Sequence, residues 1–143
     1  MKSYRLELVC ESGTDEPEEP VLRTSADVAR VLRPHFNRID REKFVVVLLS
    51  AKHRPIAVNT VSIGSLTASI VCAREVFRPA VALPTAAVIL AHNHPSGDSA
   101  PSAEDIELTR RLRQAGELLG IPVLDHVILG DGQHYSFADS GAW

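Results

Sequence analysis

Two uninterrupted apolar runs constrain the fold of this chain more than any other feature of its sequence. Residues 44–50 read FVVVLLS, and residues 86–91 read AAVILA. A strand that is apolar at every position is typical of one buried on both faces, so that a layer of chain covers each side of its sheet. The two runs therefore predict a layered α/β domain with these strands in its sheet.

The segments around these runs predict the remaining elements. Further strand patterns occur at residues 55–62, 68–71, 123–130 and 134–137. The first of them follows the turn AKHR and is expected to form a central hairpin with the run at residues 44–50. Helical patterns occur at residues 26–34, 74–82 and 102–119. Helices that alternate with hairpin-like pairs predict an α/β (α+β) fold, a three-layer α/β/α sandwich around a mixed central sheet.

Local signals mark where two of these helices begin and end. Ser25 is expected to cap the first helix, and Pro34 is expected to end it. Ser102 opens the last helix and Gly120 closes it, because glycine readily takes the left-handed conformation that ends many helices. The last helix follows directly from the loop after the second apolar run.

Residues 1–24 are predicted to stand apart from one main domain at residues 25–143. Residues 4–9 alternate polar and apolar as an edge strand does, and an acidic loop, ESGTDEPEEP, follows them. The edge pattern suggests a homodimer as a hypothesis. No signal peptide and no apolar run of roughly 20 residues is seen, which predicts no membrane contact. Two cysteines without a CxxC pair favour a cytoplasmic protein.

The charge balance argues against nucleic acid as the first partner of this chain. Its formal net charge is -3 and its pI is near 6.0. Tight binding to a phosphate backbone depends on many lysine and arginine contacts that release counterions. Direct nucleic-acid binding by the isolated chain is therefore not expected.

Three residues have the spacing of a metal site. His92 and His94 follow an apolar strand two residues apart, so both imidazoles project from the same face. Asp105 lies in the first turn of the next helix, whose positive N-terminus favours an ionised carboxylate. Two histidines, one carboxylate and a water form the open tetrahedral site of a catalytic zinc ion.

Each part of this pattern also has a simpler interpretation. Two histidines in a loop often bind nothing, and Ser102 and Asp105 have the spacing of a capping box, which stabilises a helix without any metal. His126 either lies in the core or contacts a metal ligand from behind, and the core position is favoured.

The complete spacing, H-x-H-x7-S-x2-D, is that of the JAMM (MPN-plus) metal signature, and the chain resembles the RadC family. The resemblance covers GSLTASIVCAREVF, HNHPSGDSAPSAEDIELTRRL and LLGIPVLDHVILGDGQHYSF. It implies a JAB/MPN fold, similar to that of cytidine deaminase, that binds one Zn²⁺ through His92, His94 and Asp105. It also implies that Ser102 supports an oxyanion and that an upstream glutamate is the general acid and base.

Glu42 best matches this glutamate, because it immediately precedes the first apolar strand. A general base at this position takes a proton from the attacking water and returns it to the leaving amine. The alternative is Glu75, which is expected instead to pair with Arg74 or Arg78 on a helix surface.

The resemblance implies a zinc metallopeptidase that cleaves a peptide or isopeptide bond. Two other functions are consistent with it. One is an accessory role in DNA repair or recombination, which the charge and the apparent lack of room for a helix-hairpin-helix region disfavour. The other is a metal-stabilised interaction module without turnover, which the complete set of ligands disfavours.

Overall fold

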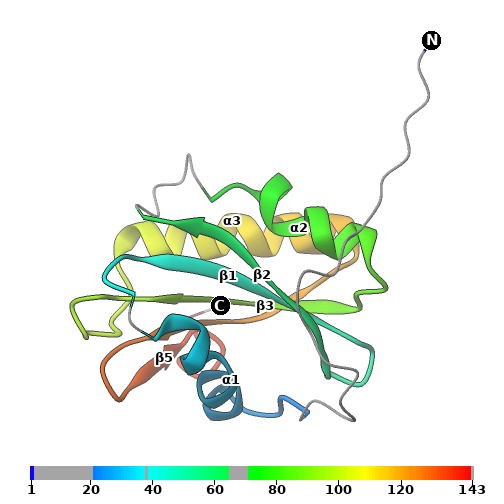
Figure 1. Ribbon diagram of the computed structural model, residues 1–143. Coiled ribbons are helices and arrows are strands. Elements are labelled where there is room, and N and C mark those ends of the chain that lie inside the picture. The colour runs from blue at the N-terminus through cyan, green and yellow to red at the C-terminus, as the bar shows by residue number, and fades with distance from the viewer. Residues whose placement is uncertain (2–20, 38, 65–70, 143) are drawn as a thin grey trace.

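The computed structural model, which describes residue 1 and residues 21–37, 39–64 and 71–142, is a mixed sheet between two helical layers (Figure 1). Its helices are α1 (Ser25–Leu32), the 3-10 helix η1 (Arg33–Phe36), α2 (Ala73–Ala82) and α3 (Ala103–Leu119). Its strands are β1 (Lys43–Leu49), β2 (Pro55–Ile63), β3 (Ala87–Asn93), β4 (Val123–Leu129) and β5 (His134–Ser136). The predicted fold class is confirmed.

The described sheet has the strand order β2-β1-β3-β4-β5. Strands β3 and β4 are parallel and are joined through α3, whereas the other neighbours are antiparallel. Figure 1 shows α2 and α3 above the sheet and α1 below it. No described helix combines the length and the hydropathy that a membrane span requires.

The apolar runs are explained by a separate core on each face of the sheet. Alternate side chains of β1 and β3 pack under α2 and α3, and this set contains Phe44, Val46, Leu48, Val88 and Leu90. The side chains between them pack against α1, and this set contains Val45, Val47, Leu49, Ile89 and Ala91. Because both faces are covered, every residue of β1 and β3 is buried except Lys43 at the start of β1, which is partly buried.

The β1–β2 hairpin differs from its prediction in its place in the sheet. The hairpin of β1 and β2 forms, but β2 ends the described sheet and β3 takes the central position between β1 and β4, so the hairpin is not central. The reason is burial, since most of β2 is only partly buried or exposed whereas every residue of β3 is buried. The strand expected at residues 68–71 falls largely outside the described residues, as do the strand at residues 4–9 and the acidic loop.

Helix α1 differs from its prediction at both ends. The N-cap is Thr24 rather than Ser25: its Oγ1 accepts from the backbone N–H of Asp27 at 3.2 Å, and the Asp27 carboxylate accepts from the Thr24 N–H at 3.2 Å. Pro34 does not stop the helical chain, because it lies in the first turn of η1, where a backbone N–H is not needed. Helix α1 ends at Leu32, and η1 begins at the next residue, Arg33.

Candidate metal centre

The site lies where β3 ends and α3 begins. Strand β3 runs past the predicted limit of residue 91, and so it includes His92, which pairs with Phe44 of β1 and Ile128 of β4. His92 is fully buried, and the His94 side chain is 13% exposed. Their Nε2 atoms lie 3.0 Å apart, so both rings point to the same place as the two-residue spacing predicts.

Asp105 completes the group from the first turn of α3. Its Oδ1 lies 3.2 Å from Nε2 of His92, and its Oδ2 lies 3.3 Å from Nε2 of His94. Ligands bound tetrahedrally at zinc distances of about 2.0–2.2 Å lie about 3.3–3.5 Å from one another. The separations here agree with that spacing to a few tenths of an ångström. The three residues could therefore hold a metal ion.

The helix cap and the metal site are the same structure rather than alternatives. Oδ2 of Asp105 accepts from the backbone N–H of Ser102 at 2.8 Å and from its hydroxyl at 2.7 Å, while Ser102 Oγ accepts from the Asp105 N–H at 3.1 Å. Both bonds to the carboxylate use Oδ2, and they hold Oδ1 toward His92. The capping box thus orients the carboxylate that the metal requires.

The charge state of Asp105 suits a ligand. Burial alone would raise its pKa, but the contact with His92, the charge of that ring when protonated, and the bonds from Ser102 outweigh burial. Together they hold the pKa of Asp105 well below its usual range. The carboxylate is therefore ionised throughout the physiological pH range.

A tight loop fixes the ring of His94. Its Nδ1 lies 2.8 Å from the backbone carbonyl of Asp98. A carbonyl only accepts, so Nδ1 carries the hydrogen, and in the neutral ring Nε2 presents its lone pair to the site. Gly97 has φ +87°, a conformation that favours glycine, and its carbonyl accepts from the N–H of Asp131 at 2.8 Å. Gly97 therefore shapes the loop that brings the Asp98 carbonyl to His94.

His126 lies in the core, as expected, and it also contacts a ligand. Its Nε2 is 2.8 Å from Nδ1 of His92, and its Nδ1 is 2.6 Å from Oγ1 of Thr109. The ring is fully buried. The sequence left both roles open for His126 and favoured the core position, but it assigned no role to Thr109. The usable signal was the position of Thr109, one helical turn after Asp105.

Asn93, the residue between the two histidines, fixes the chain around Glu42. Its Oδ1 accepts from the N–H of Lys43 at 2.8 Å, and its Nδ2 donates to the carbonyl of Arg41 at 3.0 Å. Glu42 lies between these two contacts and is partly buried. The pairing of β1 with β3 ends at Phe44 and His92, and Glu42 lies just before the first residue of β1, Lys43.

Glu75 has the surroundings predicted for it. In α2 its Oε1 lies 2.7 Å from NH2 of Arg78 and 3.5 Å from Nε of Arg74. Both arginine side chains are largely exposed. Glu75 is thus a surface ion-pair partner.

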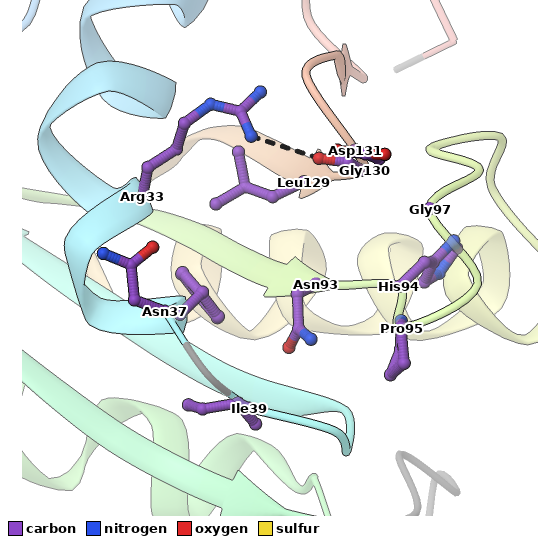
Figure 2. Close-up of a pocket in the computed structure, with 11 residues that line it drawn as sticks. Arg33, Asn37, Ile39, Asn93, His94, Pro95, Gly97, Leu129, Gly130 and Asp131 are labelled. Carbon is purple, nitrogen blue, oxygen red and sulfur yellow. Dashed lines mark hydrogen bonds between the residues drawn. The ribbon is translucent and has the colours of Figure 1, made fainter.

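A polar cleft of about 290 Å³ borders the site on the α1 side (Figure 2). His94 and Asn93 form part of its wall, with η1 and the turn between β4 and β5 opposite them. Across the cleft Arg33 donates to the carbonyls of Gly130 at 3.1 Å and Gln133 at 2.9 Å, which ties η1 to that turn.

The fold and the site together define a JAB-type domain with a candidate metal centre. The model of the RadC-like JAB domain family matches residues 22–142. The chain belongs to the RadC family. A UPF0758 protein of Rubrobacter xylanophilus is 50% identical over 125 residues, which cover 87% of this chain and 55% of the relative. A UPF0758 protein of Desulfitobacterium hafniense is 44% identical over 137 residues, or 95% and 60%. The chain thus spans between half and two thirds of these relatives.

Proposed function

We propose that this domain is a zinc-dependent hydrolase of the JAMM type that cleaves a peptide or isopeptide bond. The observation that carries the proposal is the convergence of His92, His94 and Asp105 at tetrahedral spacing, with an open fourth position. A bound zinc ion supplies a Lewis acid that polarises a carbonyl and lowers the pKa of water. The protein residues around it then bind the substrate and move protons.

Glu42 is the proposed general base. The pairing of β1 with β3 supports a position beside the metal but outside its three ligands, and Asn93 holds the backbone on both sides of it. Its carboxylate takes a proton from the attacking water and passes it to the leaving amine, so that no net proton is consumed by the residue. Glu75 is already paired with two arginines, which supports the choice of Glu42.

Ser102 is the proposed donor to the oxyanion. Its side chain is at the N-cap of α3, where the helix dipole also favours developing negative charge. The hydroxyl donates to Asp105 at 2.7 Å, and in the proposed role it would turn from Asp105 to donate to a substrate carbonyl. Removal of one such donor typically lowers kcat by about 10²–10³-fold.

Elemental analysis of the purified protein, beside hydrolysis of a panel of fluorogenic peptides and lysine-linked isopeptides, tests the proposal. We expect about one zinc per chain in the wild type and in Glu42→Gln, and almost none in His94→Ala or Asp105→Ala. Hydrolysis should fall by about 10²–10⁴-fold in Glu42→Gln. The matched variant Glu75→Gln should keep both zinc and activity.

The outcomes separate the parts of the proposal. A wild-type protein that takes up no zinc after incubation with the ion would refute the metal centre. Zinc retention with equal activity in Glu42→Gln and the wild type would refute the base assignment and leave the metal centre standing.

A further inference from the structure

A continuous chain of hydrogen bonds runs behind the metal site and joins two of its ligands. It begins at Nδ1 of His92, passes to Nε2 of His126 at 2.8 Å, and continues from Nδ1 of His126 to Oγ1 of Thr109 at 2.6 Å. It ends where Thr109 Oγ1 meets the backbone carbonyl of Asp105 at 2.6 Å. The chain therefore links β3, β4 and α3 through buried side chains.

The carbonyl at the end of this chain sets its direction. A carbonyl only accepts, so the Thr109 hydroxyl gives its hydrogen to Asp105, and its oxygen is left to accept from Nδ1–H of His126. A neutral imidazole has a single N–H, so Nε2 of His126 must accept from Nδ1–H of His92. His92 then presents Nε2, without a hydrogen when the ring is neutral, to Asp105 and His94.

We infer that Thr109 and His126 are positioning residues that hold His92 in the tautomer with its hydrogen on Nδ1, which leaves Nε2 free to bind the metal. This inference deepens the proposed function, on which it rests only for the identity of the metal. The hydrogen on Nδ1 of His92 is a property of the metal-free chain and can be measured there. Neither residue touches the open position where a substrate would react.

The surroundings of His126 keep this arrangement unambiguous. Its ring stacks on Phe137 at a centroid distance of 5.2 Å and meets Phe44 edge-on at 5.4 Å, so it cannot rotate freely. The ring is fully buried, and none of the hydrogen bonds described for it comes from a carboxylate. The nearby Asp125 carboxylate is occupied by other donors, including the His126 backbone N–H at 2.7 Å and the Ser136 hydroxyl at 2.7 Å.

Thr109→Val is the most informative change because valine keeps the shape of the side chain and removes only the hydroxyl. Without that oxygen, Nδ1–H of His126 has no acceptor, and His126 gains by moving its hydrogen to Nε2, facing His92. His92 would then accept at Nδ1 and carry its hydrogen on Nε2, where the metal has to bind. We expect zinc affinity to fall by about 10–100-fold, as is typical when the partner of a ligand histidine is lost.

The test combines zinc affinity, measured by competition with a chelating dye, and the tautomers of His92 and His126, measured by long-range ¹H–¹⁵N NMR correlation. In the wild type we expect His92 and His126 each to carry a hydrogen on Nδ1, and His126 Nε2 to carry none. Thr109→Val should change the tautomer of both rings and weaken zinc binding. Thr109→Ser, which keeps the hydroxyl, should restore both to within about two-fold of the wild type.

Two results would overturn the inference. One is a wild-type His92 that carries no hydrogen on Nδ1, a result that does not depend on whether any variant folds. The other is a folded Thr109→Val protein with unchanged zinc affinity and unchanged tautomers. If the wild type binds no zinc at all, the proposed function fails, whereas the NMR measurement on the metal-free chain still decides the inference.

Discussion

Replacement of Gly130 by alanine should disrupt the metal site from a position outside it. A Cβ at this residue would lie 2.3 Å from the carbonyl oxygen of Gly97 and 3.0 Å from the backbone nitrogen of Ser99, where 3.4 Å is an ordinary contact. The loop would have to move by about 1 Å, a displacement that costs about 1–3 kcal/mol of stability in a packed structure.

The affected loop carries the group that orients His94. Nδ1 of His94 donates to the carbonyl of Asp98 at 2.8 Å, one residue after Gly97. A displacement of about 1 Å would lengthen this contact to about 3.8 Å, beyond hydrogen-bonding range. We therefore expect Gly130→Ala to weaken zinc binding by about 10–100-fold.

Gly132→Ala is the matched control. Gly132 lies in the same turn with φ +66°, and a Cβ there meets nothing within 4 Å. Alanine should cost about 1 kcal/mol through backbone conformation and leave zinc affinity unchanged. Chelator competition measures affinity, and urea unfolding of the metal-free proteins measures stability. Equal zinc affinity in Gly130→Ala and the wild type would show that the loop does not control His94.

Three further predictions follow from other contacts. Asn93→Leu should keep zinc and lower hydrolysis by about 10²-fold, because a shift of about 1 Å in the segment that carries Glu42 is sufficient to slow the reaction by that factor. Elemental analysis measures the zinc content, and the peptide assay measures the hydrolysis. Asp27→Asn should reduce helix stability at neutral pH, because the bond with Arg30, followed by that with Thr24, lowers the pKa of Asp27. A lowered pKa contributes stability above the unfolded value near 3.8 and loses it as pH falls, so the two unfolding curves should converge in acid. Leu112→Ala, at a site 1% exposed in α3, should cost about 2–5 kcal/mol in urea unfolding, and a loss below about 1 kcal/mol would contradict the packing described.

The sequence was most informative where a feature depends on neighbouring residues. The period of two in a strand was enough to bring His92 and His94 to one face, and the spacing of a capping box was enough to place Asp105 at the first turn of α3. Both are local geometry. The cap of α1 fell one residue away at Thr24, because Thr24 rather than Ser25 lies three residues before Asp27 and forms a capping box with it.

Features that depend on strand register could not be predicted. His126 reaches His92 only because β4 lies parallel to β3 in a register that pairs Ile128 with His92. That register joins segments more than 30 residues apart, and no local pattern reports it. The role of Thr109 could not be predicted for the same reason, because Thr109 acts through its hydrogen bond with His126. The β1–β2 hairpin lies at one end of the described sheet because β3 pairs with β1 on one side and with β4 on the other. That pairing likewise joins distant segments.

The separate origins of the ligands and of Glu42 have a consequence for folding. All three ligands fall within residues 92–105, which form the end of β3, the loop and the first turn of α3. Closing so short a loop costs little chain entropy. A metal ion bound by these three residues would therefore act as a local cross-link that holds α3 against β3 before the long-range pairing of the parallel strands is complete. Such an ion would favour early folding of the part of the sheet that contains β3 and β4, and the β1–β2 hairpin could join it later.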